Sequence, residues 1–139
     1  MSEQIIRQVL EAEATSVFNS LSHQMRVVFQ NTAYTPKVGV PYAQCYVIPA
    51  RTIDPSIGDK HSRRVGIFQI SVFLNSNEGS KNMFPIMDAV DAAFFRGKNF
   101  EKNGKWVSID SSPSYSQASV QNGWYVFHIS IDYRMEVFR

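Results

Sequence analysis

Residues 124–137, Trp-Tyr-Val-Phe-His-Ile-Ser-Ile-Asp-Tyr-Arg-Met-Glu-Val, alternate between apolar and mostly polar side chains over fourteen positions. Successive side chains of a strand point to opposite faces of its sheet, so this alternation predicts one long strand with a buried face. Its apolar face would carry Tyr125, Phe127, Ile129, Ile131, Tyr133, Met135 and Val137. This strand is the clearest element of the chain, and the other elements must pack around it.

Several shorter segments also have the composition of strands. Residues 25–29 are rich in β-branched side chains, and residues 42–48 form a second run that ends at Pro49. Residues 65–74 are apolar on both faces, which is typical of a strand in the centre of a sheet. Asn103-Gly104, between residues 100–102 and 106–109, indicates a tight hairpin. The serine-rich segment 111–121 is predicted to be a loop or an irregular edge strand.

Two segments have the periodicity of amphipathic helices. In residues 2–21, apolar side chains recur at steps of three and four, which predicts one buried stripe. A second helix is predicted from a cap at Ser80 to a point before Gly97, where a left-handed residue can end it. The expected buried residues are Ile6, Val9, Leu10, Val17 and Leu21 in the first helix and Phe84, Met87, Val90 and Phe94 in the second.

Residues 51–64 have few apolar side chains and are predicted to form a long exposed loop, mobile in the isolated protein. Lys60, His61, Arg63 and Arg64 make this loop basic. Such a group is more often a solvated surface, or a contact for an acidic partner, than a nucleic-acid site.

Length and composition exclude several classes of protein. The 139 residues suit one domain spanning residues 1–139, and 44% hydrophobic with 19% charged residues is ordinary for a globular protein. A net charge of +2 is far from the strong positive field of a dedicated nucleic-acid binder. No apolar run is long enough for a membrane span, and the start does not resemble a signal peptide, so we expect a soluble protein made in a cytoplasm.

The polar residues reveal no catalytic or metal site. His128, Ser130 and Asp132 share one face of the predicted strand, but about 13 Å separates the histidine from the aspartate, so the acid cannot orient the imidazole. His23 and His61 lack metal-ligand spacing, and the single cysteine, Cys45, suits a small buried position. Phosphate-binding glycine loops are absent from the sequence. We therefore expect no enzyme activity and no cofactor.

The order of the elements and several phrases resemble the bacteriophage tail terminator or tail-completion proteins, a family of small phage proteins. The resemblance spans roughly residues 5–133. The phrases that carry it are Val40-Pro41-Tyr42, Gly66-Ile67-Phe68-Gln69-Ile70, Phe94-Phe95-Arg96-Gly97, Gly123-Trp124-Tyr125 and Ile131-Asp132-Tyr133.

This resemblance implies an α+β fold, in which a mixed, mostly antiparallel sheet of about five or six strands packs against two main helices. It also implies a homo-oligomeric ring, commonly a hexamer, that ends growth of the tail tube and offers a docking face to the head connector. The expected partners are therefore the chain itself, the tail tube protein and the head-tail connector protein, with passing contact with DNA in the lumen. The expected location is the virion tail, after assembly in the host cytoplasm. The candidate subunit or tube contacts are Arg51, Asp54, Lys60, His61, Arg63 and Arg64.

Two other functions remain open at this point. A head-tail neck or connector ring would also oligomerise but would bind the head side first. A small-ligand-binding or enzymatic domain would instead be a monomer with a deep polar pocket.

Overall fold

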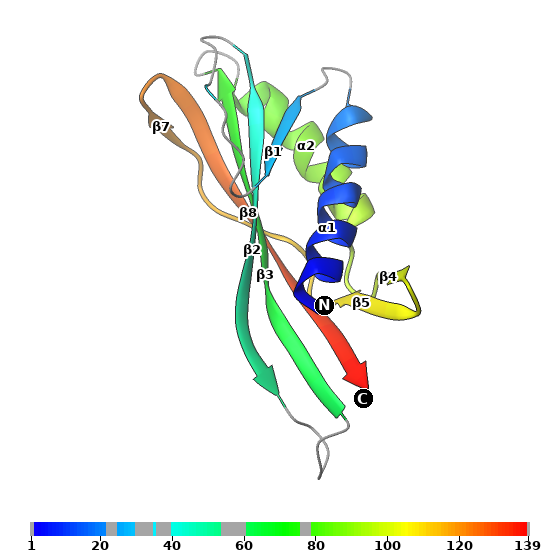
Figure 1. Ribbon diagram of the computed structural model, residues 1–139. Coiled ribbons are helices and arrows are strands. Elements are labelled where there is room, and N and C mark those ends of the chain that lie inside the picture. The colour runs from blue at the N-terminus through cyan, green and yellow to red at the C-terminus, as the bar shows by residue number, and fades with distance from the viewer. Residues whose placement is uncertain are drawn as a thin grey trace.

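The fold is seen in a computed structural model that describes residues 2–21, 25–29, 35, 40–53, 61–75 and 79–138. Two helices cover one face of a curved sheet (Figure 1). The helices are α1 (Ser2–Asn19) and α2 (Gly79–Ala93). The strands are β1 (Arg26–Phe29), β2 (Tyr42–Ile53), β3 (His61–Asn75), β4 (Asn99–Lys102), β5 (Lys105–Ile109), β6 (Ser114–Tyr115), β7 (Ser119–Gln121) and β8 (Trp124–Phe138).

The sheet has the strand order β1-β2-β3-β8-β5-β4, and the short strands β6 and β7 also pair with β8. Only the β1–β2 pair among the described strands is parallel, and the other pairs are antiparallel. The expected α+β fold, with two helices and a mixed, mostly antiparallel sheet, is therefore confirmed.

Strand β8 organises this sheet through both of its edges. One edge pairs with β3 along the whole strand, from Trp124 opposite Asn75 to Phe138 opposite His61. The other edge is covered in turn by β7, β6 and β5. The segment 111–121, expected to be irregular, thus contributes two short strands to that edge.

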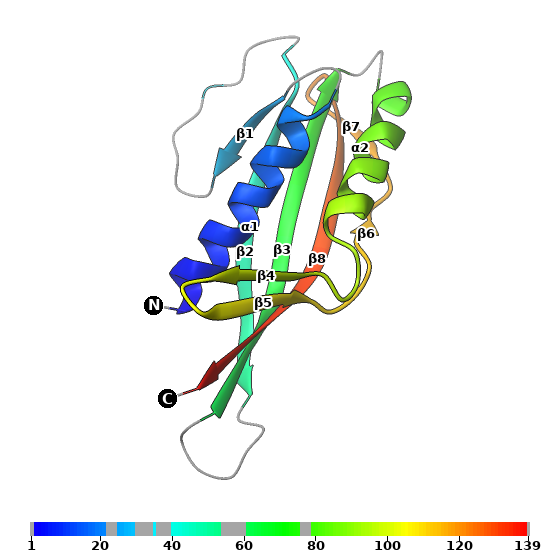
Figure 2. The same cartoon turned by 90° about the vertical axis from the view of Figure 1, so that its right-hand side faces the viewer.

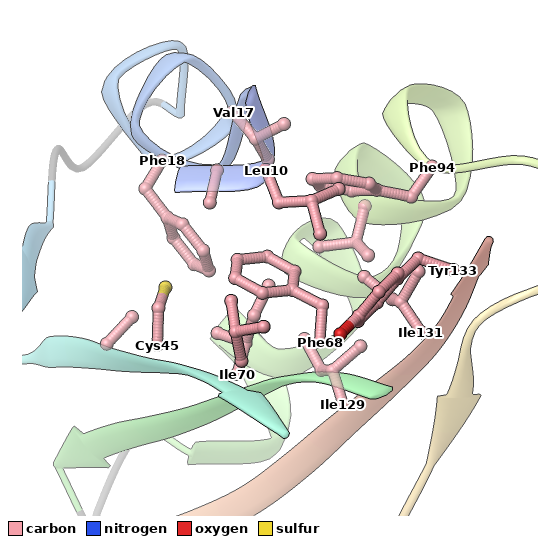
Figure 3. Close-up of a cluster of buried hydrophobic side chains, with 14 of the residues drawn as sticks. Leu10, Val17, Phe18, Cys45, Phe68, Ile70, Phe94, Ile129, Ile131 and Tyr133 are labelled. Atoms are coloured by element: carbon pink, nitrogen blue, oxygen red, sulfur yellow. The ribbon is translucent and has the colours of Figure 1, made fainter. Parts of the chain in front are cut away.

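The core lies between the helices and the sheet (Figure 3). Leu10 and Phe18 from α1, together with Phe94 just after α2, are fully buried against the sheet. The sheet supplies the alternating side chains predicted for β8, and Phe127, Ile129, Ile131, Tyr133 and Met135 are all buried. Each such side chain contributes about 1.5–3 kcal/mol through removal of apolar surface from water, so this layer holds the fold together.

The segment around Pro49 corrects the predicted strand ends. Strand β2 does not end at Pro49 but continues to Ile53, with a bulge between Pro49 and Arg51. A proline fits there because β1 pairs only with Tyr42–Cys45 and leaves this part of β2 at the sheet edge, where no backbone N–H is needed. The predicted loop 51–64 was wrong at both ends, since residues 51–53 belong to β2 and residues 61–64 to β3; its middle, 54–60, lies outside the described residues.

The buried stripe of α2 also differs from the prediction. Phe84 is 60% exposed, whereas Ile86 is buried beside the predicted Met87, Val90 and Phe94. The inward stripe runs through Met83, Ile86 and Met87, and a helical residue next to such a stripe faces outward. The helix begins at Gly79, so Ser80 is its second residue and not its cap.

The predicted hairpin is present between β4 and β5. Asn103 and Gly104 have φ angles of 55° and 76°, the left-handed values that a two-residue hairpin turn requires at both positions. The helix α2 ends at Ala93, so Gly97, with φ of 89°, lies in the turn that follows and does not cap the helix as predicted; it donates its N–H to Ile109 O at 2.8 Å. The hairpin is thereby joined to the end of α2.

Candidate interaction surfaces

The face of the sheet opposite the helices is covered by no described helix or strand (Figure 1). At one end, Tyr42 stacks on Phe73 with ring centroids 4.5 Å apart, and Trp124 meets Tyr42 edge-on at 5.5 Å. In the middle, Ser71 Oγ and His128 Nδ1 form a hydrogen bond of 2.8 Å. This face is therefore aromatic at one end and polar in its centre.

His128 and Asp132, which with Ser130 resemble a catalytic triad, form hydrogen bonds with separate partners. The imidazole of His128 bonds to Ser71, and Asp132 Oδ2 accepts a hydrogen bond of 2.8 Å from Ser111 Oγ. Among the described residues, no group of three or more His, Cys, Asp or Glu side chains could hold a metal ion. Burial raises the pKa of the Cys45 thiol to about 12, so the thiolate that a nucleophile needs does not form at neutral pH.

Beyond the Gly66–Tyr133 pair, β2, β3 and β8 continue past the helices as a three-stranded projection (Figure 1). We call it the distal arm, and it comprises residues 50–53, 61–65 and 134–138. Arg63 Nε lies 2.7 Å from Glu136 Oε1, Arg134 Nε lies 3.9 Å from the same oxygen, and Arg134 Nη1 lies 3.4 Å from Asp110 Oδ1. A ladder of partly exposed ion pairs therefore runs along the arm.

The structure brings four of the six predicted contact residues to this arm. Arg51 lies in β2 opposite Val65, and His61 begins β3 opposite Phe138. Arg63 and Arg64 are adjacent in β3 and so point to opposite faces, with Arg63 bound to Glu136. Asp54 and Lys60 lie outside the described residues.

The sequence prediction missed the exposed aromatic residues on the helix side. Phe84 and Phe95 are 60% and 48% exposed, and Trp106 in β5 is 57% exposed. Trp106 could have been found from alternation, because its neighbour Val107 is buried and side chains next to each other in a strand face opposite ways.

Phe84, Asp88, Asp91 and Phe95 recur at steps of four, three and four, and all four side chains are exposed. We call these four residues the α2 outer face. Residues at such steps lie on one side of a helix, so Asp88 and Asp91 lie on the same side of α2 as Phe84, and Phe95 follows two residues after the helix ends.

Tyr115 of β6 fixes the position of the α2 outer face. Its hydroxyl donates to Asp91 Oδ1 at 2.6 Å and lies 3.0 Å from Met87 O. Burial raises the pKa of Tyr115, and the hydrogen bond to Asp91 raises it further. The phenol therefore stays protonated and holds α2 against the strands.

Among known protein families, the phage tail terminator protein family has a model that matches residues 5–133 of this chain. No curated protein matches the sequence. One similar solved structure, of a protein whose name states no function, has a TM-score of 0.82 at 25% identity, and the alignment covers 100% of this chain and 99% of that one. No described helix has both the length and the hydropathy to span a membrane.

Proposed function

Because this chain belongs to the phage tail terminator protein family, we propose that it forms a closed ring at the head-proximal end of the tail tube. The ring, most simply of six copies, ends tube polymerisation and gives the head connector a surface to dock on. The family is structural and not enzymatic, and it belongs to the virion tail.

The observation that carries this proposal is the extent of the family match. Residues 5–133 include nearly all of α1, the whole of α2 and most of β8, so the match covers the elements that build the core.

The distal arm supports a role in assembly. It extends past the helices, so its side chains can reach a neighbouring subunit or the tube without disturbing the core (Figure 1). Arg51, His61, Arg63 and Arg64 remain the contacts proposed on the arm, and Asp54 and Lys60, which lie outside the described residues, remain proposed contacts as well. To bind a carboxylate of the partner, Arg63 would have to leave Glu136 or bind both carboxylates at once.

The test is tube polymerisation in the presence of the purified chain. Tube protein is assembled with increasing amounts of the chain, and tube lengths and ends are measured in negative-stain images. We expect shorter tubes that carry a ring at one end only, and a ring-sized mass of the chain by light scattering. Unchanged tube lengths, together with a monomer at every concentration, would exclude the proposal.

A second measurement separates a terminator from a neck protein. The chain is mixed with tube protein and with connector protein separately, and the complexes are resolved by size. A terminator binds the tube without the connector, whereas a ring that binds only the connector would be a neck component.

A further inference from the structure

We propose that the β4–β5 hairpin of one copy of this chain docks on the α2 outer face of the next copy. This inference rests on the proposed ring and names the two surfaces that would join its subunits. Three features of the molecule support it: the α2 outer face is acidic, the hairpin is basic, and the turn of the hairpin lies away from α2.

The α2 outer face is acidic and partly apolar. Asp88 and Asp91 are exposed, and Phe84 and Phe95 flank them in the sequence. In the part of the chain that the structure describes, Asp88 has no ion pair, and Asp91 is bound only by the neutral Tyr115 hydroxyl. Both negative charges therefore remain uncompensated, and a basic partner surface would neutralise them.

The β4–β5 hairpin has the opposite charge. Residues 98–105 contain three lysines and one glutamate. Lys102 and Lys105 pair directly across the turn, and like charges in such a cross-strand pair repel each other. Neither lysine forms an ion pair with any described residue, so carboxylates from a partner would relieve this repulsion. Trp106, the next residue of β5, adds a large exposed ring on the other face of the hairpin.

The turn of the hairpin lies away from α2, although the base of the hairpin adjoins the end of α2, where Lys98 Nζ lies 5.7 Å from the centroid of the Phe95 ring. Figure 2 shows the hairpin crossing α1 near its N-terminal end, with the turn on one side of the helix layer and α2 on the other. A contact of α2 with α2 would oppose carboxylates, whereas a contact of hairpin with α2 joins unlike charges. Because two different patches meet, the contact is head-to-tail, and repeated head-to-tail contacts give a ring when the rotation between copies closes and an open filament when it does not.

Charge reversal in both directions tests this contact. The variants are Asp88→Lys, the pair Lys102→Glu with Lys105→Glu, and a chain that carries all three changes. Every interface of the combined chain carries reversed charges at position 88 and at both hairpin positions, while Asp91 stays negative, so complementarity is restored in part. Glu13→Lys on α1 reverses one charge outside both surfaces and serves as the control. Oligomer mass is measured by sedimentation over a concentration series, and thermal melting verifies that each variant folds.

We expect the Asp88 variant and the lysine pair each to weaken ring formation by about tenfold or more, and the combined chain to assemble better than the lysine-pair variant. Glu13→Lys should assemble like the wild type. Folded variants that still form rings as well as the wild type would overturn this contact and leave the proposed function standing. Variants that form rings but no longer shorten tubes would also overturn it, because the surfaces would then bind the tube. A wild-type chain that forms no ring, alone or on tubes, would overturn both.

Discussion

The helix-covered part of the sheet and the distal arm use the same three long strands but are stabilised differently. Under the helices, Phe68 and Ile70 are fully buried. In the arm, the side chains of Arg63 and Glu136 are still 34% and 29% exposed although they pair. Exposed ion pairs contribute about 0–1 kcal/mol, far less than a buried apolar side chain. Global stability therefore comes mainly from the covered part, together with Met135 at the base of the arm, which is buried and also pairs with β5. The partly exposed ion pairs of the arm are able to change without unfolding the chain.

The largest effect is expected from a charge placed under the helices. Leu10→Asp should lower the free energy of unfolding by at least about 4 kcal/mol, because a carboxylate without a partner would replace a fully buried side chain. Ala12→Asp, on the exposed side of the same helix, is the matched control and should cost less than about 1 kcal/mol. Denaturant unfolding measures both. A folded Leu10→Asp monomer that fails to assemble would show that this stripe is an interface and not part of the core.

A second large effect is expected at the boundary between the two regions. A Cβ on Gly66 would lie 2.6 Å from Ile48 O and 2.7 Å from Tyr133 Cζ, closer than real Cβ atoms approach. Because both neighbours are fixed by the sheet, we expect Gly66→Ala to cost about 2–3 kcal/mol in unfolding experiments. Val65→Ala, one residue away on the other face, should cost about 1 kcal/mol or less. Equal losses for both variants would mean that the boundary tolerates the added methyl group.

The Tyr115 contact should have an intermediate effect that depends on pH. Tyr115→Phe removes the hydrogen bond to Asp91 and should cost about 1 kcal/mol at pH 8. Since folding raises the pKa of Tyr115 above its ordinary value of 10.0, the stabilisation is present below pH 10.0 and is lost as pH rises above it. The stability difference between wild type and variant should therefore shrink from pH 9 to pH 11. A difference that stays constant over this range would contradict the shift.

The smallest effect on global stability is expected in the arm. Arg63→Gln should change the free energy of unfolding by less than about 1 kcal/mol, because its ion pair is partly exposed. Backbone amides of the arm should nevertheless exchange faster with solvent, and the increase should be weaker at high salt, where the wild-type pair is already screened. Arg7→Gln, which removes the Arg7–Glu11 pair on α1, should leave exchange in the arm unchanged. Global destabilisation by Arg63→Gln would show that the arm is part of the core.

Most of the fold could be predicted because it depends on local patterns. The alternation of residues 124–137 gave β8 and its buried face, and Asn103-Gly104 gave the hairpin. Errors arose where packing between distant segments decides. Pro49 was predicted to end its strand. It lies within β2 because β1 is too short to pair with this part of β2, and that length cannot be predicted from the residues around Pro49. Phe84 was placed in the core because its neighbours are apolar, yet the position of α2 on the sheet selects Ile86 instead.

The interaction surfaces were harder to predict than the core. Basic residues near 60–64 drew attention because they are adjacent in sequence. Arg63 and Arg64 in fact face opposite ways, and Arg63 already has a partner 73 residues away. The exposed aromatic residues were not recognised, because Phe84 was assigned to the buried face of its helix, Phe95 follows the end of α2, and Trp106 lies in the separate strand β5.

The central place of β8 has a consequence for the order of events during synthesis. β8 follows every other strand in the chain, yet β3, β5, β6 and β7 all pair with it. While the ribosome is still making residues 124–138, the nascent chain has no complete sheet, and β3 presents an unpaired edge that can join to other chains. We expect the subunit to become competent for assembly in a single late step, when this strand leaves the ribosome and takes its place in the sheet.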